Sequence, residues 1–454
     1  MSGRGRGDPE PGVDVRTAAV RVLSEVRRGA YADRAAVKHF RSLSGRDRAL
    51  GQEVAYGAIR LRARLDAELA GIVDRPLSKL DAAVLDWLRV GLYQIRETRI
   101  PAHAAVHATV EGARIMMGRG AAGMVNAVLR RAGRQETPGT SYPDPETAPV
   151  EWLSVYGSHP QWLIRRWLAR WTLAEVRRLV ENDNRAPTVT LRLLGDSGPR
   201  PGPGARKGSD ENASADVVLE SLPGWPRMVR LVGGEPARAL AAGNAVAQDP
   251  AASAVVDFVG REIEGPVLDA CAAPGGKAAA LADLAPAARP FVAADVGVSR
   301  IRLAASTLRR TGSEARPVAM DARRPAIRSA RTILLDAPCS GTGVLRRRPD
   351  ARWRTSEQRL ASLVALQVDL LEACAGLLEA GGLLVYATCS LEPEENEEQV
   401  DAFLSRRPEF VREPAIGLTG LAAECLTDAG DLQILPFRTG TDGAYASRLR
   451  KGDD

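Results

Sequence analysis

The chain has 454 residues, which is enough for about three domains. Hydrophobic residues make up 45% and charged residues 26% of it, a balance typical of globular proteins rather than disordered chains. No run of about 18 uninterrupted apolar residues is present, and the N-terminus lacks the apolar core of a signal peptide. We therefore expect no membrane span and a cytoplasmic protein.

The formal net charge of +6 permits a nucleic-acid partner without requiring one. Arginine supplies all but five of the 62 basic residues, and its planar, permanently charged guanidinium suits phosphate. Genomic composition bias would also explain most of this preference for arginine over lysine. Five cysteines in a chain without export signals favour free thiols over a disulfide framework.

The first half of the chain predicts helices. Residues 1–12 are rich in Gly, Pro and Arg and predict a disordered basic tail. Residues 13–140 carry apolar residues at helical spacing throughout, with Asp14 and Ser78 placed as helix N-caps, and predict an all-helical domain. Residues 141–246 predict a small α+β connecting subdomain, with a flexible Gly- and Pro-rich loop at 195–216.

From residue 247 to 454 short apolar runs alternate with helical segments. The runs at 266–269, 291–295, 317–321, 332–336 and 383–388 predict strands, and the first four end in an aspartate. This alternation predicts an α/β, doubly wound, Rossmann-like domain with a mostly parallel sheet. Ligands of such sheets bind at the carboxyl ends of the strands.

A cofactor site is predicted at the end of the first strand. Asp269 and Ala270 are followed by a turn whose residues are Cys271, Ala272, Ala273, Pro274, Gly275, Gly276 and Lys277. Most of these residues are small and let the backbone turn tightly against a ligand. Asp295 ends the second strand, where a carboxylate can accept hydrogen bonds from ribose hydroxyls, and Asp321 ends the third, where it can accept one from an adenine amine. The sequence has neither the GxGxxG fingerprint nor a Walker loop, so S-adenosylmethionine fits better than NAD or a triphosphate.

Two cysteines follow the last two strands of this series. Cys339 follows Asp336 at the fourth strand, and Cys389 follows the fifth. With strand order 3-2-1-4-5 these strands are neighbours, so both thiols should open into one crevice beside the cofactor. Cys374 and Cys425 are better explained as packed apolar residues. No metal site is expected, because CxxC is absent and all four histidines precede this domain.

A methyl donor beside two thiols suits methylation of a pyrimidine at carbon 5. That carbon is a poor nucleophile until a thiolate adds to carbon 6 and turns the ring into an enamine. The adduct must afterwards lose the carbon-5 proton and expel the cysteine, and a second polar group can assist that release.

The motifs DACAAPGGK, DAPCSGTGVLRRRPDARW and YATCSLEPEENEEQV resemble those of bacterial RNA 5-methylcytosine methyltransferases of the RsmB/Sun family. DNA-type enzymes use a single Pro-Cys motif instead. The helical region, with IPAHAAVHATVEGAR and MVNAVLRRA, is similar to NusB-like RNA-binding domains. The resemblance implies methylation of a cytosine of 16S ribosomal RNA, with position 967 as the expected target.

Site residues also follow from this resemblance. Cys389 would be the nucleophile and Cys339 would assist product release, while the 271–277 turn, Asp295, Asp321 and Asp336 would bind the cofactor; Asp336 would alternatively face the cytosine. Basic residues after the fourth strand should contact RNA phosphates: Arg346, Arg347, Arg348, Arg352 and Arg354.

Four expectations about partners and two alternatives remain at this point. We expect small-subunit ribosomal RNA as the partner, no membrane or metal, and a monomer. One alternative is a transfer-RNA 5-methylcytosine methyltransferase. The other is an RNA-binding or antitermination factor with an inactive methyltransferase domain, which the presence of both thiols disfavours.

Overall fold

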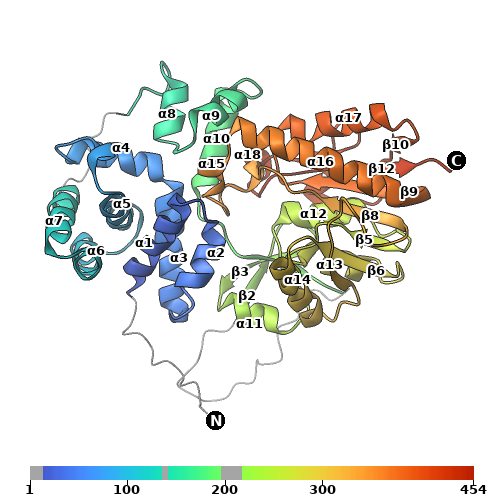
Figure 1. The fold of residues 1–454 in the computed structure, drawn as a ribbon, viewed down its shortest axis with the longest axis horizontal. Helices are drawn as coiled ribbons and strands as arrows, with labels where there is room; N and C mark the ends of the chain where they lie inside the picture. Colours follow the sequence, from blue (N-terminus) through green and yellow to red (C-terminus); the bar gives the residue numbers. More distant parts are fainter. Residues whose placement is uncertain (1–13, 135–141, 196–216, 454) are drawn as a thin grey trace, which may run out of the picture. The chain divides into compact units, whose positions relative to one another are not determined.

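A computed structural model describes residues 14–134, 142–195 and 217–453 (Figure 1). The expected basic tail at 1–12 and nearly all of the expected loop at 195–216 lie outside these ranges. The chain divides into two compact units. The first contains residues up to Ala186 together with Leu345–Arg354, and the second contains Pro187–Val344 and Thr355 to the C-terminus. These borders do not follow those expected after residues 140 and 246, because residues 142–186 belong to the first unit and the described residues between 187 and 246 belong to the second.

The first unit, here called the helical unit, is built from helices, and those between residues 15 and 134 pack around one apolar core. Its core includes Trp87, Leu88 and Leu129, all 1% exposed or less. Asp14 caps the first helix by accepting a hydrogen bond from the Arg16 N–H. Ser78 is not a cap as expected, since it lies inside a short 3-10 helix and Asp81 caps the next α-helix. The helices are α1 (Val15–Arg27), α2 (Ala32–His39), α3 (Gly45–Arg60), α4 (Arg62–Ile72), α5 (Ala82–Glu97), α6 (Ala102–Met117), α7 (Arg119–Arg134), α8 (Pro149–Val155), α9 (Gln161–Leu168), α10 (Leu173–Asn184) and α15 (Ala351–Arg354).

The second unit, here called the sheet unit, begins with a small antiparallel sheet. Its strand order is β2-β3-β1-β4. The buried side chains of β1 pack with Val229 and Ala245 in a separate apolar cluster. The elements are β1 (Thr190–Leu193), β2 (Val218–Ser221), β3 (Met228–Gly233), α11 (Pro236–Ala241) and β4 (Ala245–Ala247).

The large sheet of this unit has the order β10-β12-β9-β8-β5-β6-β7, with β11 paired to β12. The five strands from β7 to β9 are parallel and reproduce the expected order 3-2-1-4-5. Antiparallel β12 extends the sheet beyond β9. The strands are β5 (Val267–Asp269), β6 (Phe291–Asp295), β7 (Arg316–Ala319), β8 (Ala330–Asp336), β9 (Leu378–Thr388), β10 (Phe410–Arg412), β11 (Leu432–Ile434) and β12 (Ala444–Lys451).

Helices cover both faces of the large sheet, as alternating side chains show. Val267 and Val385 point into a core with α12 (Pro250–Val259), α13 (Gly276–Leu284) and part of α14 (Val298–Arg310). Leu268 and Leu384, one position away, point into a core with α16 (Glu357–Leu377) and α17 (Glu397–Arg406). Because both faces are buried, the central strands are apolar at nearly every position.

Among the described residues, α16 is long and apolar enough to pass a length-and-hydropathy test for a membrane span. In the structure it packs on β8, β9 and α17 and buries Leu370, Leu371 and Cys374. Its sequence is not an uninterrupted apolar run, because Arg359, Asp369 and Glu372 lie within this helix.

Candidate active site

The turn between β5 and α13 lies at the carboxyl edge of the large sheet. Gly275 has a φ of +97°, and a Cβ there would lie 2.9 Å from Cα of Ala304. Its N–H donates to the Ala272 carbonyl at 2.7 Å, which closes the turn, and Gly276 begins α13. A side chain at position 275 would be both strained and in collision. The expected Gly-Gly turn therefore has a structural reason at its first glycine.

Asp269, at the end of β5, is a polar side chain that the sequence analysis did not assign to the site. It is fully buried, and neither carboxyl oxygen has a hydrogen-bond partner among the described residues. Burial and the nearby Asp336 carboxylate raise the pKa of Asp269 to about 8, although the positive charge of Lys277 opposes this rise. Buried polar groups are normally hydrogen-bonded, so an unsatisfied acceptor beside the turn suits the ammonium group of S-adenosylmethionine. The position of Asp269 at the end of an apolar strand was the sequence signal that could have identified it as a site residue.

The other two acids expected at the cofactor already have partners. Asp295 is almost fully buried and accepts hydrogen bonds from the Gly297 N–H at 2.9 Å and from Arg300 at 3.1 Å. Asp321 is partly exposed and pairs with Arg323 at 2.7 Å. These contacts use acceptor positions that a nucleoside would also need, so Arg300 and Arg323 would share or yield them on binding.

The two cysteines expected in one crevice lie side by side. Their Sγ atoms are 3.3 Å apart, and the N–H of Cys389 donates to Sγ of Cys339, also at 3.3 Å. The reason is the pairing of β8 with β9, in which Asp336 is opposite Ala387. Both thiols are partly exposed, whereas Cys374 is fully buried in the core.

Each thiol has a different charged neighbour. Nζ of Lys277 donates to Oδ2 of Asp336 at 2.8 Å. Asp336 is opposite Ala387, two residues before Cys389, so this ion pair lies at the strand end that leads to Cys389. Burial lowers the pKa of the Lys277 ammonium, whereas Asp336 and then Cys389 raise it. The pKa of Cys339 is instead raised well above its usual range by its hydrogen bond with Cys389, by burial and by the charge of Glu395.

The arginines expected to contact RNA lie in the short segment of the helical unit that follows the Cys339 motif. Arg352 is fully buried and donates to the carbonyls of Ser158 and Asp183 at 3.0 and 3.1 Å. The expectation of a phosphate contact is therefore wrong for Arg352, which fastens this segment to the helices. Arg346 is 9% exposed, and its carbonyl accepts a hydrogen bond from Arg60.

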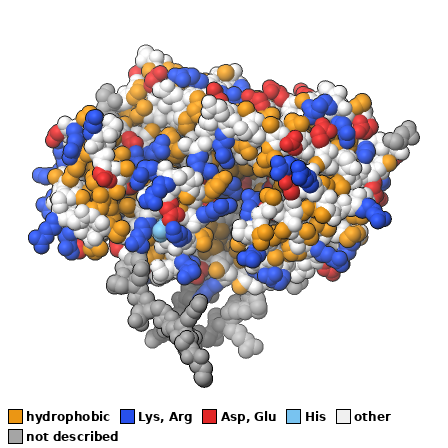
Figure 2. All heavy atoms as spheres, viewed as in Figure 1, with side chains coloured by type: hydrophobic (Ala, Val, Ile, Leu, Met, Phe, Trp, Pro, Cys, Tyr) orange, Lys and Arg blue, Asp and Glu red, His pale blue; other side chains and the backbone are white. Residues whose placement is uncertain are grey.

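The remaining arginines of this segment are more accessible. Arg347 is half-buried and Arg348 is exposed. Arg354 is half-buried, pairs with Asp350 at 3.0 Å and lies over the ring of Tyr31. On the face drawn in Figure 2, basic side chains are scattered among acidic and apolar ones rather than gathered into one patch.

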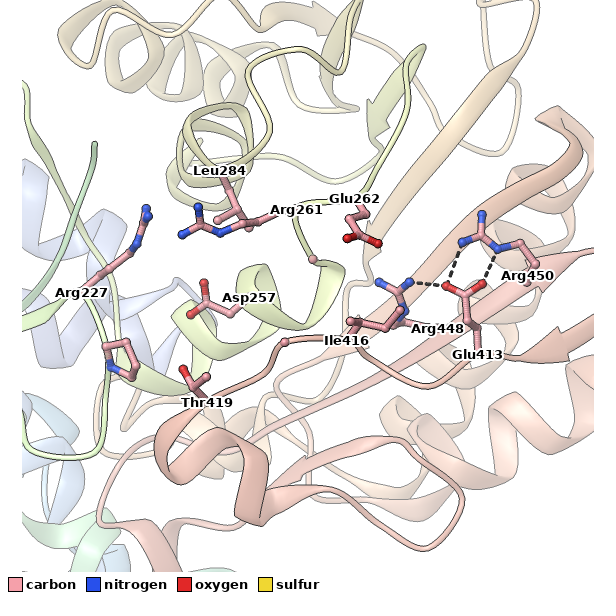
Figure 3. Close-up of a pocket in the computed structure, with 13 residues that line it drawn as sticks. Arg227, Asp257, Arg261, Glu262, Leu284, Glu413, Ile416, Thr419, Arg448 and Arg450 are labelled. Carbon is pink, nitrogen blue, oxygen red and sulfur yellow. Dashed lines mark hydrogen bonds and ion pairs between the residues drawn. The ribbon is translucent and has the colours of Figure 1, made fainter. Parts of the chain in front are cut away.

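A separate pocket of about 370 Å³ lies in the sheet unit (Figure 3). Arg448 and Arg450 line it on the part of β12 that pairs with Val385 and Leu383, toward the start of β9 and away from Cys389. Both guanidiniums are paired with Glu413. This pocket is therefore distinct from the cysteine site. Within the described ranges, no group of three or more His, Cys, Asp or Glu side chains is arranged to hold a metal ion.

Comparison with known proteins identifies the class of protein that this fold and site define. Residues 259–450 match the family model described as 16S rRNA methyltransferase RsmB/F, and residues 13–134 match the NusB family. The chain is 37% identical over 418 residues to ribosomal RNA small subunit methyltransferase B of Sodalis glossinidius, covering 90% of this chain and 91% of the relative. The protein of the same name from Cronobacter sakazakii is 34% identical over 426 residues, covering 90% and 92%.

Solved structures support the fold. The crystal structure of PH0851 has a TM-score of 0.74 at 21% identity and covers 97% of this chain and 100% of that chain. A methyltransferase homologue from Pyrococcus horikoshii has a TM-score of 0.53 at 20% identity and covers 68% and 100%. The chain belongs to the RsmB/F family, and it is an RNA methyltransferase with a NusB-like helical domain and a Rossmann-like catalytic domain. The resemblance and the fold class expected from the sequence are confirmed.

Proposed function

We propose that the protein transfers a methyl group from S-adenosylmethionine to carbon 5 of a cytosine in 16S ribosomal RNA, at the position numbered 967. The observation that carries the chemistry is the pair of partly exposed thiols, 3.3 Å apart, at the ends of adjacent strands. The names of the relatives, ribosomal RNA small subunit methyltransferase B, support the substrate.

Cys389 is the nucleophile in this proposal. Its thiolate adds to carbon 6 of the cytosine, and the ring electrons then make carbon 5 nucleophilic. Lys277 lies close enough to stabilise that thiolate, and Asp336 holds the Lys277 ammonium in place at 2.8 Å. S-adenosylmethionine supplies an electrophilic methyl group when bound, and the 271–277 turn, Asp269, Asp295 and Asp321 would hold it.

Cys339 acts in product release. Once carbon 5 carries the methyl group, its remaining proton leaves to a solvent water, the carbon 5–carbon 6 double bond re-forms, and Cys389 departs as a thiolate that the Cys339 thiol stabilises by donating a hydrogen bond. Sγ of Cys339 lies beside Sγ of Cys389 and so beside the bond that breaks. The cysteine roles therefore differ although the two side chains are neighbours.

The NusB-like region would supply RNA affinity, with Arg347 and Arg348 as the accessible phosphate contacts of the segment after β8. Arg346 would contribute less because it is more buried, and Arg354 because it is paired with Asp350 and lies over the Tyr31 ring. We further propose that the enzyme acts as a monomer in the cytoplasm, where ribosomal RNA is assembled into subunits.

Mapping 5-methylcytosine in ribosomal and transfer RNA from cells with and without the gene tests this function. Loss of one methylated cytosine in 16S ribosomal RNA, restored by the wild-type gene, is the expected result. Loss in transfer RNA alone would establish the other substrate class. An unchanged pattern, together with no binding of labelled S-adenosylmethionine, would indicate an inactive RNA-binding factor.

A further inference from the structure

A buried acid lies behind the two cysteines. Glu395 ends a short 3-10 helix, Pro393–Glu395, and its relative exposure is 0%. Its carboxyl group accepts hydrogen bonds from the Ser340 N–H at 2.8 Å, from the Ser340 hydroxyl at 2.5 Å and from Nε2 of Gln367 at 3.0 Å. A buried carboxylate is expensive unless it is satisfied in this way, so its position is specified by its neighbours.

These contacts join the two cysteine loops. Ser340 follows Cys339 and Ser390 follows Cys389, and the two hydroxyl oxygens are 3.1 Å apart. The loops also meet through the backbone, since the Gly343 N–H donates to the Cys389 carbonyl at 3.0 Å. A Cβ at position 343 would lie 2.8 Å from that carbonyl oxygen, so the approach requires glycine. Glu395 contributes the charge of this polar network.

The charge is distributed unequally between the thiols. The Glu395 carboxylate contributes to raising the pKa of Cys339, after the Cys389 hydrogen bond and burial. Burial raises the pKa of Glu395 itself, while hydrogen bonds from Ser340, Ser390 and Gln367 oppose that rise and favour the ionised form. Cys389, in contrast, lies near the Lys277 ammonium. Like charge disfavours a thiolate and opposite charge favours it.

Within the described part of the chain, Cys389 and Tyr386 also interact electrostatically with Cys339. The Tyr386 hydroxyl donates to the Glu395 carbonyl at 2.7 Å, and burial raises the pKa of that phenol well above its usual range. Tyr386 therefore stays neutral around pH 7, and Cys389 can be removed by substitution. The effect of Glu395 on Cys339 can then be measured by itself.

We propose that Glu395 is a positioning residue whose carboxylate fixes the two cysteine loops together and keeps Cys339 a neutral thiol, so that Cys389 is the cysteine that ionises and attacks. This inference rests on the proposed roles of the two cysteines. It explains how two adjacent thiols can perform different steps without a difference in residue type.

The test is the pH dependence of Cys339 alkylation by iodoacetamide, read by mass spectrometry of the peptide that contains it. The background is Cys389→Ala, so that one of the two thiols remains at the site. Adding Glu395→Gln, which keeps the size and can still hydrogen-bond, should lower the midpoint by about one pH unit and raise the rate near pH 7 about tenfold. Glu395→Asp, which keeps the charge, should leave the pH midpoint of Cys339 alkylation close to that of Cys389→Ala alone.

Glu398→Gln is the matched control, because Glu398 is an exposed glutamate of the same segment. It should leave the midpoint unchanged. An unchanged midpoint in a folded Glu395→Gln protein, verified by its melting temperature, would overturn the proposal.

If Glu395→Gln does not fold, the Cys389→Ala protein gives a second way to contradict the proposal. A Cys339 midpoint at or below that of the unfolded peptide would contradict the proposal. Alkylation requires neither RNA nor methyl transfer, so failure of the proposed function and failure of the Glu395 role are separable.

Discussion

Two clusters of buried charge, one in each unit of the molecule, differ in what they leave accessible. In the helical unit, Arg352 and His159 are at most 1% exposed, and the Arg352 guanidinium donates to backbone carbonyls and to Asn184. In the sheet unit, Lys277 and Asp336 are partly exposed and lie beside two partly exposed thiols. Buried charge alone does not identify a site. Accessible nucleophiles do. An unsatisfied acceptor does not by itself, because Oδ1 of Asp183 in the helical unit and both carboxyl oxygens of Asp269 in the sheet unit lack a hydrogen-bond partner among the described residues.

The largest effect should come from Cys389, the nucleophile in the cluster of the sheet unit. Cys389→Ala should reduce methyl transfer by a factor of about 10⁴ or more, because no thiolate remains to add to carbon 6. Cofactor affinity should be retained, since the proposal gives Cys389 no contact with the cofactor. Methylation of 16S ribosomal RNA and equilibrium binding of S-adenosylmethionine measure the two quantities; full activity would remove Cys389 from the mechanism.

Substitution in the buried cluster of the helical unit should instead lower the free energy of unfolding. Arg352→Ala leaves Asp183 buried without that guanidinium, and burial already raises the pKa of Asp183 to about 7. Arg352→Ala also removes the donor to the buried carbonyls of Ser158 and Asp183. Leaving such acceptors unsatisfied costs about 1–3 kcal/mol, which chemical denaturation would measure. Arg41→Ala, at an exposed arginine of the same unit, should change the free energy of unfolding by less than about 0.5 kcal/mol. A similar small change for Arg352→Ala would argue against its role as a fastener.

Asp269 should lower the stability of the cofactor-free protein and strengthen cofactor binding. The unfolded carboxyl ionises near 3.8 and the folded one near about 8. As pH rises through this interval the unfolded chain releases its proton first, so the cofactor-free protein loses stability. Asp269→Asn should remove this loss and weaken cofactor binding by about 1–3 kcal/mol.

Melting temperatures measured across that pH range without cofactor test the Asp269 assignment. The wild type should fall relative to Asp269→Asn, and the two should converge in acid. Asp428→Asn, at an exposed aspartate, should follow the wild type throughout. Parallel curves for Asp269→Asn and the wild type would show that Asp269 is not an isolated buried acid.

The smallest effect concerns the accessible arginines in the segment that carries Arg352. Replacing Arg347 and Arg348 with Gln should flatten the dependence of log affinity on log salt by about 0.7–0.9 for each RNA phosphate that is no longer neutralised. The same replacements at Arg302 and Arg309, which are exposed on α14, should leave the slope unchanged. An unaltered slope for the first pair would refute their contact with RNA.

The sequence was sufficient where the local pattern determines the result. Apolar strands ending in acids predicted the parallel order, and that order put Cys339 beside Cys389. Burial that depends on distant partners was not predictable. Arg352 looked like an exposed basic residue until its segment packed among Arg60, Ser158 and Asp183. Glu395 was one acid among several in a charged run, and only the fold directs it at Ser340.

The most direct test of the account is whether Cys339→Ala traps the RNA adduct. Incubated with substrate RNA and S-adenosylmethionine, this variant should accumulate a covalent protein–RNA complex that survives denaturing electrophoresis, because addition proceeds and release stalls. Cys389→Ala and the double variant should form none. Trapping by Cys389→Ala and none by Cys339→Ala would contradict the account, because it would show that the roles of the two cysteines are exchanged.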